Sequence, residues 1–176
     1  MKVLNIHERK LPASPERVGA LIDSLSSRAD RLWPRGAWSR MKFDRPLGVG
    51  AAGGHGPVRY FVEAFTPGRS IRFRFTGPRG FDGHHGYEIH DLGARGCLLQ
   101  HTLEMTTSGT ASLSWPIIFR PLHDALLEDS LALAEASLGQ PPRIRKWTVW
   151  VKVLRWLVSG GRMPAQGRSP AKSPEA

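Results

Sequence analysis

The spacing of hydrophobic residues changes twice along the first 139 residues of the chain. Residues 3–9 alternate between apolar and polar side chains, which predicts a first strand. Behind Ser14 and Pro15, residues 15–25 place an apolar residue every three or four positions, which predicts a helix. A second short helix is predicted over residues 27–32. From residue 38 to residue 105 the period is two, so we expect about five more strands joined by glycine-containing turns.

A long helix is predicted to end the domain, starting at Pro116 or Pro121 and stopping at Gly139. Its apolar residues recur at helical spacing and are Leu122, Leu126, Leu127, Leu131, Leu133, Ala134 and Leu138. The order of elements is therefore one strand, two short helices, about five strands and one long helix. This order predicts a single α+β domain over residues 1–139.

Four short segments, together with this order of elements, resemble the SRPBCC superfamily. The segments are residues 13–18 (ASPERV), 54–60 (GHGPVRY), 67–73 (PGRSIRF) and 120–129 (RPLHDALLED). The superfamily comprises START-like, or helix-grip, domains and includes polyketide cyclases and lipid carriers. The resemblance implies a curved antiparallel sheet around a long C-terminal helix, with two short helices after the first strand and an apolar cavity inside. It is a pattern of elements, so it speaks to fold more than to chemistry.

The alternation also predicts which side chains face that cavity. Ile71, Phe73 and Phe75 share one face of their strand, with Arg72 and Arg74 on the other. The same rule places His101 among apolar neighbours that face the long helix. We therefore expect a ligand site lined by Tyr60, Phe73, Phe75, His85, Tyr87, Leu99, His101, Leu103 and Leu126. Mostly apolar walls with few polar groups are typical of a small-molecule site.

His101 is the candidate catalytic residue, because imidazole titrates near neutral pH and can act as an acid or a base. Asp124 or a tyrosine hydroxyl would orient its ring. The alternative is a structural histidine, buried and hydrogen-bonded to the backbone or to Tyr87. The sequence leaves both interpretations open.

No metal or cofactor is expected. His84, His85 and His90 are close in sequence, but alternation puts His85 on the opposite face of the strand from the other two. The chain has no HExxH helix, no phosphate-binding glycine motif and a single cysteine, Cys97. That single cysteine also excludes an intrachain disulfide.

The net charge of +10 is concentrated at the C-terminal end of the chain. Residues 140–176 hold eight Lys and Arg against one Glu, whereas residues 1–139 hold 17 against 14 Asp and Glu. Basic residues confined to a short tail, without a stacking sheet or a recognition helix, argue against nucleic acid as a partner.

Residues 140–159 are predicted to form a tryptophan-rich amphipathic extension, and residues 160–176 a disordered tail. Trp147 and Trp150 fall on the apolar side of a helix, and Lys152 and Arg155 on the basic side. These four residues are the candidate contacts with an anionic membrane surface. The alternatives are a helix that packs on the domain or on another subunit, or an added strand.

The sequence therefore predicts a protein that binds a small hydrophobic or amphipathic ligand (a lipid, polyketide or aromatic metabolite) in an internal cavity. The alternative is a polyketide cyclase or aromatase-like enzyme with His101 as acid or base, and a partner-binding module is a third class. Residues 1–5 lack the apolar run of a secretory signal, so the cytoplasm is the expected location, with peripheral membrane contact through the extension. The sequence does not determine the oligomeric state.

Overall fold

The computed structural model describes residues 1–161 and residue 166, and the rest of the predicted disordered tail lies outside these residues. Within them, one antiparallel sheet runs in the order β1-β7-β6-β5-β4-β3-β2. Its strands are β1 (Lys2–Leu11), β2 (Lys42–Phe43), β3 (Ala52–His55), β4 (Val58–Thr66), β5 (Ser70–Gly77), β6 (Phe81–Asp91) and β7 (Cys97–Thr107). Strands β2 to β7 follow one another as neighbours, and β1 pairs with β7 at the opposite edge.

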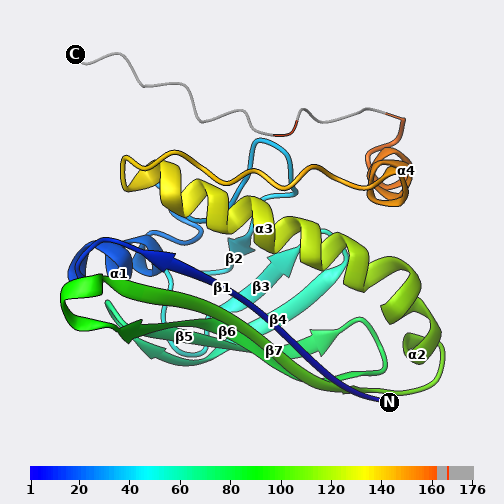
Figure 1. Cartoon of the computed structure of the whole chain (residues 1–176). Helices are drawn as coiled ribbons and strands as arrows, with labels where there is room; N and C mark the ends of the chain where they lie inside the picture. The colour runs from blue at the N-terminus through cyan, green and yellow to red at the C-terminus, as the bar shows by residue number, and fades with distance from the viewer. Residues whose placement is uncertain (162–165, 167–176) are drawn as a thin grey trace.

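The helices lie on one face of this curved sheet (Figure 1). They are α1 (Pro15–Asp23), α2 (Ala111–Ser114), α3 (Arg120–Ser137) and α4 (Val149–Val158), with a π-helical turn over Trp115–Phe119 and a 3₁₀ turn over Gly93–Arg95. α3 crosses the sheet, α1 and α2 lie at opposite ends of the molecule, and α4 lies beyond α3 on the side away from the sheet (Figure 1). This is the helix-grip arrangement that the sequence predicted.

The predicted alternation along the strands is confirmed. In β5 the side chains of Ile71, Phe73 and Phe75 are buried, whereas Arg72 is exposed. In β6 and β7 every second residue is buried in the same way. The main core forms where these inward side chains meet the inner face of α3 and the apolar face of α1.

The second short helix predicted over residues 27–32 does not form; that segment runs as turns. The carboxylate of Asp30 accepts hydrogen bonds from the backbone N–H groups of Ser26, Leu32 and Trp33, at 2.8, 3.0 and 2.8 Å. Such a side chain offers the backbone an alternative to helical hydrogen bonds, which is why aspartate favours turns. These turns bury Leu32 and Trp33 without a helix.

The predicted strand over residues 38–43 is shorter than expected, and the final helical region is longer. Only Lys42–Phe43 pairs with the sheet, opposite Gly54 and Gly53. Helical backbone begins at Ala111 and passes through the π-helical turn into α3. Pro116 and Pro121 have no backbone N–H, so neither can donate a helical hydrogen bond. One or the other was expected to start the helix, and both lie inside the helical region.

Helix α1 is held at its end of the sheet by a close approach to the turn between β4 and β5. A Cβ atom on Gly19 would lie 2.1 Å from the carbonyl oxygen of Gly68, far inside van der Waals contact. The backbone N–H of Gly68 donates to Asp23 Oδ1 at 2.8 Å, which fixes the turn against the end of the helix. Glycine at position 19 is therefore a packing requirement.

Replacing Gly19 by alanine is expected to lower the free energy of unfolding by about 1–3 kcal/mol, because the added methyl group overpacks this contact. Urea denaturation measures the change. Gly48→Ala is the matched control, since the nearest atom to its added Cβ is 3.9 Å away, and we expect little loss there. Equal effects of the two substitutions would contradict the close packing of α1.

Candidate functional site

An internal cavity of about 160 Å³ lies between the sheet and the helical segment that runs from α2 into α3. Its walls are mostly apolar, and the lining residues come from β5, β6, β7, the β3–β4 turn, α3 and α4. They are Trp38, Ser39, His55, Gly56, Pro57, Val58, Phe75, Phe81, His85, Leu103, Trp115, Ile118, Phe119, Leu122, His123, Leu126, Arg155 and Val158. A dry apolar cavity of about 150 Å³ is large enough to admit benzene.

Four of the nine predicted lining residues lie on the cavity wall: Phe75, His85, Leu103 and Leu126. The other five face the same side of the sheet but are buried in the packed core, away from the wall: Tyr60, Phe73, Tyr87, Leu99 and His101. Alternation determines which face of the sheet a side chain points to. It does not determine at which positions along the strand a cavity remains between the sheet and α3. The hydroxyl of Tyr87, for example, is bonded to Ser130 Oγ of α3 at 2.8 Å, so at this position the sheet and the helix are in direct contact.

His55 and His123 are the polar wall residues that the sequence reasoning missed. His55 ends β3 and His123 lies in the second turn of α3, so neither lies on the strands from which the cavity was predicted. Nδ1 of His55 bonds the Tyr60 hydroxyl at 2.9 Å, and burial lowers the pKa of His55 to about 3. Burial also lowers the pKa of His123. Both rings are therefore neutral at pH 7.

His85 and His101 form a buried pair, with Nδ1 of His85 3.3 Å from Nε2 of His101. His85 lies between the rings of Phe73 and Phe75, at centroid distances of 5.1 and 4.8 Å. Burial lowers the pKa of both histidines well below 6.5, so both are neutral at pH 7. Neutral imidazole has one donor and one acceptor nitrogen, so the pair shares a single proton between these two atoms.

The expectation for His101 needs correction. Its ring lies behind His85 and not on the cavity wall, and the hydrogen bond expected from Asp124 or a tyrosine is replaced by the bond to His85. The Nε2 atom of His85 is buried without a hydrogen-bond partner, and so are both ring nitrogens of His123. Buried polar atoms without a partner are rare, and a bound water, ion or ligand would complete them.

A larger hollow of about 340 Å³ lies between α3 and residues 142–144 of the extension. Asp30, on its wall, has its carboxylate bonded to three backbone N–H groups. Among the described side chains, no buried unpaired atom belongs to a residue of this hollow. The smaller cavity, with its unpaired imidazole nitrogens, is therefore the candidate site.

The C-terminal extension closes one side of the cavity and is anchored by Asp129 of α3. Asp129 Oδ2 accepts hydrogen bonds from the indole N–H groups of Trp38 and Trp147, at 2.8 and 2.9 Å. The guanidinium of Arg155 lies over the Trp38 ring, 4.4 Å from its centroid, and donates to the carbonyl of Ala37. These contacts place Arg155 on the wall.

Two of the four predicted membrane contacts are therefore wrong. The side chains of Trp147 and Arg155 are only 6% and 7% exposed, because they pack against the domain. Trp150, at 46% exposure, and Lys152 remain at the surface. Of the alternatives left open by the sequence, the structure shows a helix that packs on the domain.

Taken together, the curved antiparallel sheet and the long helix packed across it define the helix-grip fold, which is the fold that the resemblance noted in the sequence implied. No protein-family model and no curated protein matches the sequence. Solved structures do match, and all of those described below have this fold.

Truncated norcoclaurine synthase from Thalictrum flavum is 14% identical with a TM-score of 0.59, over 80% of this chain and 96% of that one. CalU16 from Micromonospora echinospora is 14% identical with a TM-score of 0.55, over 91% of this chain and 87% of that one. The di-domain ARO/CYC protein StfQ from the steffimycin biosynthetic pathway is 14% identical with a TM-score of 0.57, over 78% of this chain and 51% of that one. At these identities the likeness shows the fold.

Acidification is expected to destabilise the protein through His55. Histidine in an unfolded chain titrates near pH 6.5, whereas the pKa of folded His55 is about 3. Above about pH 6.5 the ring is neutral in both states. As the pH falls from there toward 3, the unfolded chain alone takes up the proton. The free energy of unfolding then falls by up to about 1.4 kcal/mol per pH unit.

His55→Gln keeps a hydrogen-bonding side chain beside Tyr60 but cannot titrate. Urea denaturation at a series of pH values should therefore give a shallower dependence on pH below 6.5 for this variant. Tyr60→Phe is the control, because it removes the hydroxyl partner and leaves the titrating ring in place, so the steep dependence should persist. An unchanged slope in His55→Gln would show that His55 is not a neutral buried group.

Proposed function

We propose that the protein binds a small aromatic or amphipathic molecule with one polar group in the cavity between the sheet and α3. The observation that carries the proposal is the unpartnered Nε2 atom of His85 on a mostly apolar wall. An apolar body would be taken from water by the aromatic walls, at about 25 cal/mol per Å² of buried surface. A hydroxyl or carbonyl group on that body would bond the free nitrogen, whose lack of a partner otherwise costs stability.

The size of the cavity favours an aromatic metabolite over a lipid. A volume of about 160 Å³ suits one aromatic ring with a short substituent, whereas a fatty acyl chain would extend through the wall. The wall itself is largely aromatic, with Trp38, Phe75, Phe81, Trp115 and Phe119 among its residues. One of the structurally similar proteins, norcoclaurine synthase, has been solved in complex with dopamine and hydroxybenzaldehyde, which are single-ring aromatic compounds.

His101 would act as a positioning residue for this contact. It bonds Nδ1 of His85, so its own tautomer determines whether Nε2 of His85 donates or accepts. The pair therefore suits ligands with either kind of polar group. His123, on the opposite wall, offers one further ring nitrogen without a partner, Nε2.

A second candidate is acid–base catalysis on the same ligand, as in the cyclase or aromatase alternative. The observation that favours it is the His85–His101 pair, which is a short path for a proton from the cavity wall into the core. In this arrangement His85 would touch the substrate and His101 would position it, the reverse of the role expected from the sequence. Catalysis requires the ligand to occupy the cavity beside His85, so the binding experiment below tests both candidates.

The probes p-cresol and toluene differ only in the hydroxyl group and isolate the predicted polar contact. We expect both to bind the full-length protein, with p-cresol about tenfold tighter, because one hydrogen bond to a buried group contributes about 1–1.5 kcal/mol. Titrations followed by amide chemical shifts in NMR measure both dissociation constants. In His85→Phe the tenfold preference should disappear while toluene still binds.

His84→Phe is the matched control, since His84 is the neighbouring residue on the opposite face of β6, and the preference for p-cresol should persist there. Retained toluene binding in His85→Phe shows that this variant is folded with its cavity intact. Failure of both probes to shift cavity resonances, or an unchanged preference in His85→Phe, would refute the proposed site.

We further propose that the extension brings this cavity to an anionic membrane surface. No helix within residues 1–161 is long and apolar enough to cross a bilayer, so the contact would be peripheral. Trp150, Val153, Trp156, Leu157 and Val158 are exposed on α4, and Ile117 and Ile118 are exposed on the adjoining π-helical turn. The side chain of Trp150 joins the two elements through a 2.8 Å bond to the carbonyl of Ile117.

The charge of the segment favours anionic lipid as its partner. Arg143, Arg145, Lys146 and Lys152 are exposed, and residues 140–161 contain no acidic residue. Tryptophan at headgroup depth beside basic side chains is typical of interfacial helices, and each cation contributes about 1 kcal/mol near an anionic surface. Val158 and Ile118 also line the cavity, so a ligand that partitions into lipid would reach the cavity from this side.

Sedimentation with vesicles of phosphatidylglycerol and phosphatidylcholine tests the surface contact. The double variant Trp156→Ser, Leu157→Ser removes two exposed apolar side chains, so we expect binding at least about tenfold weaker than that of the unaltered chain. Leu4→Ser with Ile6→Ser is the matched control, because these residues are comparably exposed on β1. The proposal is overturned if all three proteins sediment equally with the vesicles. It is also overturned if the unaltered chain sediments equally with vesicles that contain and that lack anionic lipid.

A further inference from the structure

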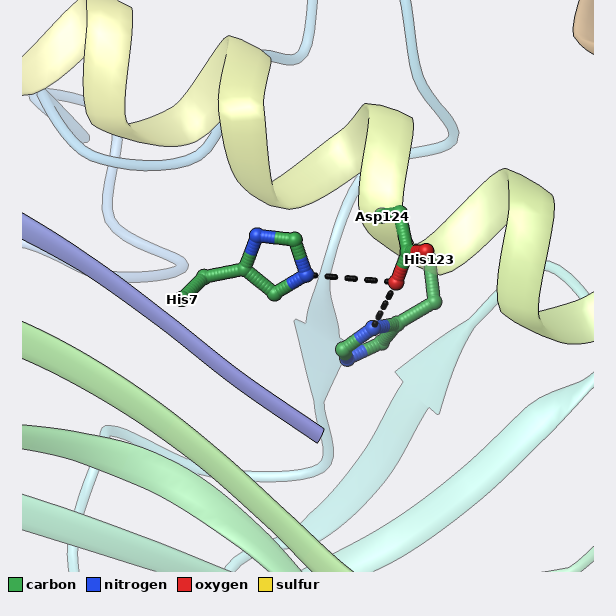
Figure 2. A group of neighbouring side chains, drawn as sticks. All are labelled: His7, His123 and Asp124. Carbon is green, nitrogen blue, oxygen red and sulfur yellow. Dashed lines mark hydrogen bonds and ion pairs between the residues drawn. The ribbon is translucent and has the colours of Figure 1, made fainter. Parts of the chain in front are cut away.

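A cluster of donor atoms lies at the seam between β1 and α3, and of its residues the sequence singled out only Asp124, as a partner for His101. His7 comes from β1, and His123 and Asp124 come from α3; Figure 2 shows both imidazole rings directed at the same carboxylate oxygen. Nε2 of His7 is 3.2 Å from Asp124 Oδ1, and Nδ1 of His123 is 3.8 Å from that oxygen. One nitrogen of each ring and one carboxylate oxygen all lie within 4.8 Å of one another.

The cluster is incomplete as a hydrogen-bonded network. Nδ1 of His123 is buried and makes no hydrogen bond, since 3.8 Å exceeds hydrogen-bond distance. Asn5 shows the same pattern: its amide nitrogen donates to Asp124 Oδ1 at 2.9 Å, while its amide oxygen is buried without a partner. Nδ1 of His123 and the amide oxygen of Asn5, two residues that contact this carboxylate or lie beside it, are therefore buried without a hydrogen-bond partner. A bound cation would supply what both atoms lack.

The surroundings of His7 are those of a metal-binding histidine. Its second nitrogen, Nδ1, bonds Glu128 Oε1 at 3.0 Å, and Glu128 is held in turn by Arg9 at 3.0 Å. In many zinc sites a carboxylate bonds the ring nitrogen that does not coordinate the metal. This bond fixes the ring and directs its other nitrogen at the ion. The side chain of His7 is only 10% exposed, so its ring is held firmly between the strand and the helix.

We propose that His7 Nε2, His123 Nδ1 and Asp124 Oδ1 bind a divalent first-row transition metal ion such as Zn²⁺. Two imidazoles with one carboxylate suit zinc and its neighbours, whereas Mg²⁺ and Ca²⁺ prefer oxygen ligands throughout. The proton between His7 and Asp124 leaves the site when the metal binds, because coordination needs the lone pair of the ring nitrogen.

The spacing of the donor atoms is close to that of a tetrahedral site. With metal–ligand bonds of about 2.0–2.1 Å, ligand atoms of such a site are about 3.3 Å apart. The separation between His7 and Asp124 already matches this value. Nδ1 of His123, 3.8 Å from the same oxygen, would have to move toward it, and the two imidazole nitrogens, which lie within 4.8 Å of each other, would also have to approach. The ion would tie the edge strand of the sheet to α3 beside the cavity wall to which His123 also contributes.

Cobalt provides a direct test, since Co²⁺ bound by nitrogen and oxygen ligands in a tetrahedral site absorbs visible light. The full chain, with any affinity tag removed and after treatment with a chelator, is titrated with Co²⁺, and Zn²⁺ is then added in competition. We expect one equivalent of Co²⁺ to bind with a visible absorption band, Zn²⁺ to displace it, and Zn²⁺ to raise the melting temperature. Both His123→Gln and Asp124→Asn should weaken binding at least about 100-fold.

Two further variants separate the site from general effects on the fold. Glu128→Gln keeps every proposed ligand but alters the support of His7, so an intermediate loss of about 10–100-fold is expected. His84→Gln removes a histidine from the outer face of the sheet and should leave the affinity unchanged. Circular dichroism checks that each variant is folded. The proposal fails if the unaltered chain binds no stoichiometric Co²⁺, if His123→Gln and Asp124→Asn bind it normally, or if His84→Gln is the variant that abolishes binding.

Discussion

The packing of α3 across the sheet is the interaction on which the rest of this structure depends. Leu127 and Leu131 bury the inner face of the helix in the main core, and Ser130 bonds both Tyr87 and the carbonyl of Leu32. Along its edge, carboxylates of the helix meet basic residues of β1, with Arg9 bonded to both Glu128 and Glu135. Apolar burial supplies most of the free energy, while the paired charges specify which strand the helix lies beside.

The cavity follows from where this packing ends. The helical region turns through the π-helical segment before α3 begins, and Trp115, Ile118 and Phe119 of that turn face the space between helix and sheet. Single π-helical turns are often found at functional sites, because the extra residue in the turn redirects neighbouring side chains. Here the strands below contribute Phe75, His85 and Leu103, and the wall is mostly apolar, with imidazole rings, Ser39 and Arg155 as its polar residues. Under the proposed function, the Nε2 atom of His85 on this wall would give the space a preference for ligands with a polar substituent.

Histidine is unusually concentrated in this part of the molecule. His7, His55, His85, His101 and His123 come from four different strands and one helix, and their rings lie in or beside the same interior. Burial keeps His55, His85, His101 and His123 neutral, so each can accept as well as donate a hydrogen bond. The two proposed sites use different atoms of this set. The ligand site uses the His85 nitrogen on the cavity wall, and the metal site uses nitrogens at the seam with β1.

The sequence by itself determined the class of fold and the inward faces of the long strands between residues 58 and 107. Alternation in residues 71–75 and 97–105 follows directly from the geometry of a half-buried strand, and the helical spacing of Leu126, Leu127 and Leu131 follows from that of a helix. Local chemistry also explains why the helix predicted over residues 27–32 does not form. The carboxylate of Asp30 accepts hydrogen bonds from backbone N–H groups that a helix would otherwise use.

Only the tertiary structure decided which inward residues line a cavity and which groups meet across it. His7 and Asp124 are 117 residues apart, and Trp38 and Asp129 are 91 apart, so no spacing along the chain indicates either contact. The burial of Trp147 and Arg155 likewise depends on an acceptor, Asp129, and a ring, Trp38, that belong to distant elements. The periodicity of the sequence indicates whether a side chain faces water or protein. Which residues it contacts there depends on how the helices and strands pack together.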